Sequence, residues 1–213
     1  MGACNVPVDE WELDIVASGS QKGYMIPPGL SFVSMSEKAW QASEDSNLPK
    51  FYLNLKTYKK SLSSNSNPYT PAVNLVFALD ESLKMMKDEG LDKIFKRHER
   101  HKLAVSEAAK TLNLKLFADE NHLSPSVTAI QIEDMDAEQF RKNIKNKYNI
   151  LLAGGQDHLK GKIFRVGHLG YINDRDIISV IAAIGNTLVD LNITSTEKAG
   201  EALRAVSCQL SGS

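Results

Sequence analysis

The sequence predicts an α/β fold in two sections. Strand-like segments occur both before and after a long helical stretch, and 213 residues are enough to bury a substantial core. The composition, with 42% hydrophobic and 24% charged residues, is that of a globular protein. We place the domains at residues 1–90 and 91–213, with the boundary within the long helical stretch.

The N-terminal section should contain two short strands, at 13–18 and 29–35, separated by a Pro-Pro-Gly turn. The first is apolar and reads as buried. Ser36 is a typical helix N-cap, so a helix should begin there, whereas 61–71 ("SLSSNSNPYTP") has the composition of a loop. Two strands do not make an independent sheet domain. This section is therefore either an appendage or the end of a larger sheet.

The remaining elements follow from periodicity. Apolar residues recur at helical spacing from Val73 to Met86, a pattern that Gly90 ends, and a second helix is expected at 91–112. Beyond it the sequence predicts four strands and three further helices. The strands are expected at 115–119, 126–132, 149–155 and 162–167, and the helices at 136–147, 174–191 and 195–208.

Several functional classes are excluded by composition. A formal charge of -1 gives no electrostatic reason to expect nucleic acid or an anionic membrane as partner. No apolar run approaches the ~18 residues of a membrane span. Cys4 and Cys208 lie far apart without metal-ligand spacing, which favours a reducing, cytoplasmic compartment. An iron–sulfur cluster held by this chain is excluded, because such clusters normally need about four thiolates.

Other candidate motifs fail on spacing. The histidines of "HERH" (98–101) are three apart rather than four, so this segment is interpreted as a solvated, charged helix face. "GGQDHLKGK" (154–162) lacks the spacing and the Ser or Thr of a phosphate-binding loop, and "GSQKG" is not a nucleophile elbow. His122, His158 and His168 are isolated and read as ordinary polar residues. No metal site is expected.

The segment "SGSQKG" (18–23) places Lys22 directly after an apolar strand. A rigid, partly desolvated position suits a lysine that forms a covalent bond with a carbonyl. The small residues around it would let a planar group approach the backbone, and their hydroxyl and N–H groups could bind an anion. An ordinary surface lysine remains the alternative from the residues alone.

The exact residues of this segment favour a lysine that forms a covalent bond over an ordinary surface lysine. "DIVASGSQKGYMIPPGLSFVS" (14–34) resembles the lysine segment of class V aminotransferases, which are fold-type I pyridoxal phosphate enzymes, and above all of the serine/alanine–glyoxylate aminotransferases. The resemblance implies that Lys22 binds the cofactor covalently and acts as the catalytic lysine. It also implies that Gln21 contacts the cofactor phosphate. A histidine before the lysine would be typical of cysteine desulfurase relatives instead.

Two further segments extend the resemblance. "NPYTP" (67–71) is similar to the loop that reaches the neighbouring subunit's cofactor phosphate, which implies that role for Thr70; Asn67 departs from the tyrosine of some relatives. "FRVGHLG" (164–170) resembles the segment whose arginine binds the substrate carboxylate, which assigns that role to Arg165. A guanidinium pairs bidentately with a carboxylate, as a lysine cannot. The wider run is similar to cyanobacterial members labelled soluble hydrogenase small subunit.

The resemblance implies the end of a fold-type I large domain followed by the small α+β domain. The expected protein is a homodimeric, cytoplasmic aminotransferase that uses pyridoxal 5'-phosphate. It would move an amino group from serine or alanine to glyoxylate or another 2-oxo acid. Because the resemblance covers only the C-terminal half of a family member, we expect a truncated polypeptide. The alternatives are an inactive remnant that serves as a folded binding module, and a lyase or desulfurase, which Gln21 disfavours.

Overall fold

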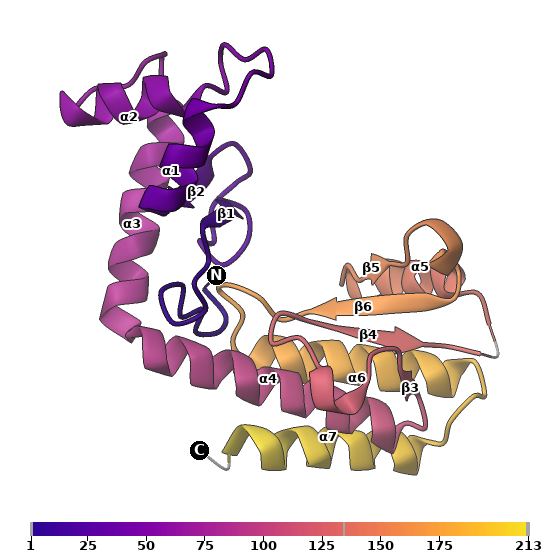
Figure 1. Cartoon of the computed structure of the whole chain (residues 1–213). Helices are drawn as coiled ribbons and strands as arrows, with labels where there is room; N and C mark the ends of the chain where they lie inside the picture. The colour runs from indigo at the N-terminus through magenta and orange to yellow at the C-terminus, as the bar shows by residue number, and fades with distance from the viewer. Residues whose placement is uncertain (1, 134, 212–213) are drawn as a thin grey trace. The chain divides into compact units, whose positions relative to one another are not determined.

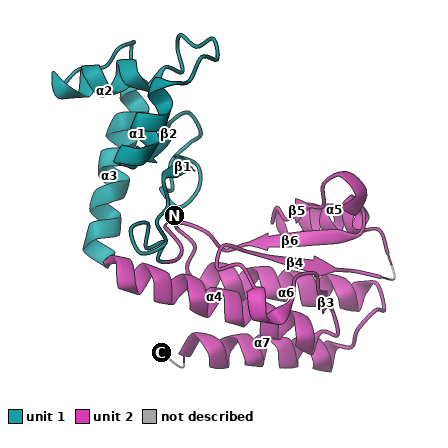
Figure 2. Cartoon of the chain, viewed as in Figure 1, with its two compact units in different colours: residues 1, 5–89 teal, residues 2–4, 90–213 magenta. Residues whose placement is uncertain are grey.

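The computed structural model describes residues 2–133 and 135–211, which divide into two compact units (Figure 2). The first comprises residues 5–89, and the second comprises residues 2–4 and the chain from Gly90 onward. Gly90 separates two helices and has φ 86° and ψ 135°. Glycine adopts this left-handed conformation without the steric cost of a Cβ.

Unit 1 contains a two-stranded antiparallel sheet and three helices (Figure 1). The strands and the helix start at Ser36 agree with the sequence predictions, and the Ser36 hydroxyl accepts the Ala39 N–H at 3.1 Å. Asp14 in turn accepts the Ser36 hydroxyl at 2.6 Å, which ties the first helix to the sheet. The elements are β1 (Ile15–Gly19), β2 (Ser31–Met35), α1 (Glu37–Glu44), α2 (Leu55–Ser63) and α3 (Val73–Glu89).

Two expectations for unit 1 are wrong. β1 is not a buried strand: Ile15 is 61% exposed, because β1 pairs with β2 alone and few side chains cover it. The loop expected at 61–71 starts later, because α2 extends to Ser63. Sequence analysis missed α2 although Asn54 supplies an N-cap, accepting the Lys56 N–H at 3.2 Å.

Unit 2 is an α+β unit around a four-stranded antiparallel sheet with strand order β3-β4-β6-β5. The strand and helix types match those predicted. β5 is much shorter than the expected 149–155, and the last helix is longer than 195–208. The elements are α4 (Leu91–Thr111), β3 (Lys115–Leu116), β4 (Val127–Gln131), α5 (Ala137–Tyr148), β5 (Ala153–Gly154), β6 (Ile163–Gly167), α6 (Asp174–Asp190) and α7 (Thr196–Ser211).

Helices cover one face of this sheet. Phe164 of β6 contacts Phe140 of α5 at a ring-centroid distance of 5.1 Å, and both rings are fully buried. α4 and α6 continue the same layer, and α7 packs against these two helices (Figure 1). Burial of such large side chains contributes roughly 1.5–3 kcal/mol each. The other face of the sheet is more exposed around Arg165, with half-buried Ala129 and exposed Ala153 on neighbouring strands, although Ile163 on that face is buried.

The interpretation of the "HERH" segment is also wrong. This segment is not a solvated face, because His98 and His101 are fully buried, whereas Glu99 between them is exposed. Both rings lie on the inward stripe of α4, which continues at helical spacing through Val105. Burial is tolerated because each ring is hydrogen-bonded, His98 to the Ile94 carbonyl at 2.7 Å and His101 to a carboxylate.

His168 is also buried, directly after β6. Its Nδ1 lies 3.1 Å from the Pro125 carbonyl and its Nε2 lies 2.9 Å from the Thr128 hydroxyl. The carbonyl can only accept, so Nδ1 carries the proton and neutral Nε2 accepts from Thr128. Burial, together with smaller contributions from the nearby His101 and His98, lowers the pKa of His168 to about 4.

This shift predicts acid destabilisation of unit 2. Between about pH 6.5 and pH 4 the unfolded chain binds the proton and the folded chain does not, so stability falls as pH falls. At roughly 1.36 kcal/mol per pKa unit, the loss attributable to His168 is about 3 kcal/mol. Urea unfolding at both ends of this range should show His168→Gln losing less stability than wild type by about this amount.

The matched control is His122→Gln, because the His122 side chain is 81% exposed. It should follow the wild-type pH dependence. Equal losses in wild type and His168→Gln would show that His168 is not held neutral in the folded protein.

Candidate functional site

Ser20 organises the loop that carries Lys22. It is fully buried, donates its hydroxyl to the Pro27 carbonyl at 2.8 Å and accepts the Leu30 N–H at 3.1 Å. Its backbone N–H also binds the Leu30 carbonyl at 3.0 Å, and its carbonyl accepts the Ile26 N–H at 3.3 Å. One residue therefore joins both ends of the loop between β1 and β2, which fixes its shape.

The loop presents Lys22 to solvent on a tight turn. The Lys22 N–H binds the Gly19 carbonyl at 3.3 Å, and the Lys22 carbonyl accepts the Met25 N–H at 3.0 Å. The Gln21 side chain folds back over Gly19, where a Cβ would lie 2.9 Å from Gln21 Oε1. Gln21 and Lys22 are both exposed, so the amide and the amine stand on the same rigid turn.

Helix α3 supports this loop through a hydrogen bond to the loop backbone. Buried Ser82 donates its hydroxyl to the Tyr24 carbonyl at 2.5 Å. The Tyr24 ring packs on Phe32 of β2 with centroids 4.6 Å apart. These contacts come from two different elements, so the lysine turn is anchored to both the sheet and the third helix.

Thr70 lies in a separate part of unit 1, on the exposed segment before α3. Its neighbour Tyr69 anchors this segment: the Tyr69 hydroxyl donates to the Phe51 carbonyl at 3.3 Å, and its ring lies 4.8 Å from that of Tyr52. Tyr58 completes an aromatic cluster at 6.0 Å from Tyr69. Thr70 is thus held at the end of an ordered aromatic segment.

Arg165 projects from the open face of the unit 2 sheet. Its neighbours Phe164 and Val166 are buried against the helices, and alternation along a strand places Arg165 on the opposite face. It is half-buried, and its Nε donates to the Gly154 carbonyl at 2.8 Å. This bond orients the guanidinium through its Nε.

Two glycines allow this arrangement. A Cβ on Gly154 would lie 2.5 Å from Glu138 Oε1, and a Cβ on Gly155 would lie 2.0 Å from the Leu159 carbonyl oxygen. The second distance involves backbone, which cannot move aside without rebuilding the turn. The "AGG" sequence therefore serves close packing beside Arg165.

Segment 154–162 does not have the structure of a phosphate-binding loop. A single turn of 3-10 helix at Asp157–Leu159 leads into β6, whereas a phosphate-binding loop leads into a helix. Across residues 2–133 and 135–211, no group of three His, Cys, Asp or Glu side chains is arranged to hold a metal ion. Nor is any helix within those ranges both long and apolar enough to cross a bilayer.

The site residues suggested by the sequence thus lie in three places. Gln21 and Lys22 share one turn, Thr70 lies elsewhere in unit 1, and Arg165 belongs to unit 2. The residues that sequence analysis missed are the supporting ones, Ser20 and Gly154. Only the small-residue composition around them was visible, and it did not identify their hydrogen-bond partners.

The fold is that of pyridoxal-phosphate-dependent aminotransferases, whose solved structures it matches over about half of their length. The family model for class V aminotransferases matches residues 1–169. The chain therefore belongs to the class V aminotransferase family, as the motifs had indicated.

Named relatives agree with this assignment. The chain is 52% identical to the soluble hydrogenase small subunit of Synechococcus sp., over 92% of this chain and 51% of that protein. It is 33% identical to the serine–glyoxylate aminotransferase of Methylorubrum extorquens, over 95% of this chain and 52% of that protein. The chain thus spans about half the length of the curated relatives it matches.

A solved structure gives the same result. The ureidoglycine–glyoxylate aminotransferase of Bacillus subtilis superimposes with a TM-score of 0.88 at 29% identity, covering 97% of this chain and 55% of that one. The prediction that the chain corresponds to part of a fold-type I enzyme is therefore confirmed.

The hydrogen bonds of Ser20 predict a sharp effect of its removal. Ser20→Ala removes two part-buried hydrogen bonds, to the Leu30 N–H and the Pro27 carbonyl, which together should cost about 1–3 kcal/mol and loosen the lysine turn. Amide hydrogen exchange should increase in residues 19–30. Ser63→Ala is the matched control, since its exposed hydroxyl bonds only the Lys60 carbonyl of its own helix. Equal exchange in both variants would contradict the role of Ser20.

Proposed function

We propose that this chain is the lysine-bearing and carboxylate-binding part of a pyridoxal-phosphate-dependent aminotransferase. It moves an amino group from a small amino acid, serine or alanine, to glyoxylate or another 2-oxo acid. The observation that carries the proposal is the rigid turn that presents Lys22 beside Gln21. Residues 1–90 supply the cofactor side of this chemistry and residues 91–213 the substrate carboxylate side.

The donor set fits the cofactor. Lys22 offers a primary amine on a preorganised turn, as attachment to an aldehyde requires. Gln21 and Thr70 offer an amide N–H and a hydroxyl, both good donors to a phosphate oxygen. When bound, pyridoxal phosphate supplies the electron sink that stabilises negative charge at the substrate Cα.

Lys22 also has a second role in this proposal. Its amine, once released from the cofactor, takes the proton from the substrate Cα and returns one to the acceptor carbon as general base and acid. The Ser20 contacts fix the turn that carries Lys22. This matters because proton transfer needs the Lys22 nitrogen within hydrogen-bond reach of the carbon that loses or gains the proton.

Arg165 selects substrates by their carboxylate. The Gly154 carbonyl occupies its Nε, so the terminal nitrogens form the fork that pairs with two carboxylate oxygens. Amino acids and 2-oxo acids share this group, so one arginine serves both half-reactions. Small Ala129 and Ala153 flank Arg165 on the adjacent strands and leave the guanidinium accessible from the open face.

The assembly and compartment belong to the same proposal. A homodimer would let the Thr70 segment of one subunit reach the cofactor phosphate of the other. Free, exposed Cys4 and Cys208 suit a reducing cytoplasm. Hydrogenase chemistry is not part of the proposal, since two cysteines are too few for an iron–sulfur cluster.

Cofactor attachment at Lys22 is the test of the proposal. The chain incubated with pyridoxal phosphate should develop a pH-sensitive absorbance band, and borohydride reduction followed by peptide mapping should place the adduct on Lys22. Lys22→Ala should lose both signals, whereas Lys87→Ala, which removes an exposed lysine of α3, should keep them. Adducts scattered over surface lysines would contradict the proposal and favour a non-catalytic binding module.

Arg165 provides an independent prediction. Arg165→Lys keeps the positive charge but loses the fork, so glyoxylate affinity measured by calorimetry should fall about tenfold or more. Arg175→Lys is the matched control, because Arg175 is exposed at the start of α6. Unchanged affinity in Arg165→Lys would remove Arg165 from the carboxylate site.

A further inference from the structure

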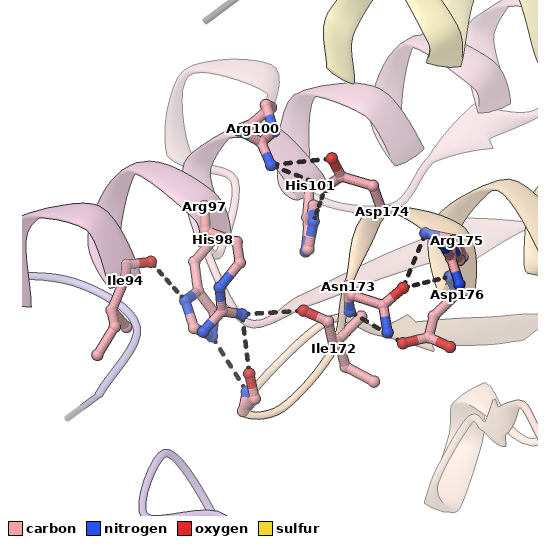
Figure 3. Close-up of polar contacts among 11 residues, drawn as sticks. Ile94, Arg97, His98, Arg100, His101, Ile172, Asn173, Asp174, Arg175 and Asp176 are labelled. Carbon is pink, nitrogen blue, oxygen red and sulfur yellow. Dashed lines mark hydrogen bonds and ion pairs between the residues drawn. The ribbon is translucent and has the colours of Figure 1, made fainter. Parts of the chain in front are cut away.

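The side chains at 97, 98, 100 and 101, here called the α4 clamp, bind the segment that follows β6 (Figure 3). Arg97 Nη1 donates to the carbonyls of Gly170 and Ile172, each at 2.9 Å. His98 Nε2 accepts the Gly170 N–H at 3.0 Å. Both polar backbone groups of Gly170 are therefore bound by neighbouring side chains of one helix.

The clamp also holds the first residue of α6. Arg100 Nη2 donates to both oxygens of Asp174, at 2.8 and 3.1 Å, and His101 Nε2 donates to Oδ1 at 2.8 Å. Burial raises the pKa of Asp174, but the bonds from Arg100 and His101 outweigh it and hold that pKa below the ordinary value. The carboxylate is therefore charged, and segment 168–174 is anchored at its far end as well.

The geometry requires His98 to be neutral. Its Nδ1 faces the Ile94 carbonyl and must carry a proton, while its Nε2 faces the Gly170 N–H and must not. A proton on Nε2 would set two hydrogens against each other and break the Gly170 bond.

The charged groups around the clamp oppose a further positive charge. Arg97 and Arg100 lie on the same helix, and Arg97 and Arg100 together with burial lower the pKa of His101 despite its Asp174 partner. His168, directly after β6, lies close enough to His98 and His101 for their charges to interact, and Lys102 acts on His168 in the same way.

The clamped segment is the direct continuation of β6. Gly167, the last residue of that strand, pairs with Val127, and the next residue binds the Ser126 carbonyl through its N–H at 3.0 Å. Arg165 lies two residues earlier, and its Nε is tethered to β5. Releasing the segment would let the end of β6 shift relative to β5, and displacements of about 1 Å are enough to weaken a preorganised site.

We propose that Arg97 and His98 are positioning residues for Arg165, and that they hold the end of β6 in place only while His98 is neutral. The inference deepens the proposed function, since it rests on Arg165 being the carboxylate-binding residue. Acidification sufficient to protonate His98 would then weaken carboxylate binding without removing any group that touches the substrate.

Three variants, each compared with wild type, test this proposal by nuclear magnetic resonance of the full protein. His98→Gln keeps an acceptor that cannot be protonated, and His98→Leu keeps none. Glu99→Gln is the matched control on the exposed side of α4. The two readouts are the exchange protection of the Gly170 amide, relative to its intrinsic rate, and the Arg165 Nε–H resonance. Both are followed from about pH 7.5 to about pH 4.5, a range that extends well below histidine's ordinary pKa of about 6.5.

In wild type and Glu99→Gln, Gly170 protection should fall about tenfold on acidification and the Arg165 resonance should move with the same midpoint. His98→Gln should hold both readouts constant, and His98→Leu should show the released values at every pH. Gly170 release without any change at Arg165 would overturn the positioning role and leave the clamp merely structural. A pH response retained in His98→Gln would overturn the role of His98 even if His98→Leu fails to fold.

A glyoxylate titration of the same resonance separates this inference from the proposed function. If Arg165 binds the carboxylate, glyoxylate should shift its resonance, and His98→Leu should weaken that binding about tenfold at the higher pH. If glyoxylate does not shift the Arg165 resonance of the wild type, the proposed carboxylate role is contradicted. The coupling between Gly170 and Arg165 would still be decided by the pH series.

Discussion

The alternation of side chains along β6 decides where the functional groups of unit 2 lie. Helices cover only one face of the sheet, so Phe164 and Val166 must point into them, and Arg165 between them must point away. Shifting the strand register by one residue would bury the arginine and expose the phenylalanine. The packing of Phe164 and Val166 thus places Arg165 on the open face, and this placement needs no specific contact made by Arg165 itself.

Buried polar groups then fix the orientation of the candidate residues and of the segments that carry them. Ser20 shapes the lysine turn, the Gly154 carbonyl orients Arg165, and the α4 clamp holds the segment after β6. Loops cannot be fixed by apolar packing alone, because their backbone N–H and carbonyl groups need partners wherever water is excluded. Both candidate regions therefore depend on polar residues that would not touch a substrate.

The sequence predicted the elements of the fold well and their supporting contacts poorly. Local signals such as the Ser36 cap and the apolar spacing of α4 lie within a few residues and could be recognised. His98 could have been recognised as buried, since Ile94, His98, His101 and Val105 form one stripe at helical spacing. Its partner Gly170 is 72 residues away, and no local pattern identifies that pairing.

The two candidate regions differ in their sensitivity to acid. The lysine turn is anchored by the hydroxyls of Ser20 and Ser82, which do not titrate in the physiological range. The anchors of the Arg165 region include two buried histidines, His98 and His168, which must stay neutral for their contacts to persist. Because each region belongs to its own compact unit, acid can release the second while the first stays intact. Cofactor attachment and carboxylate binding would then have different lower pH limits in one polypeptide.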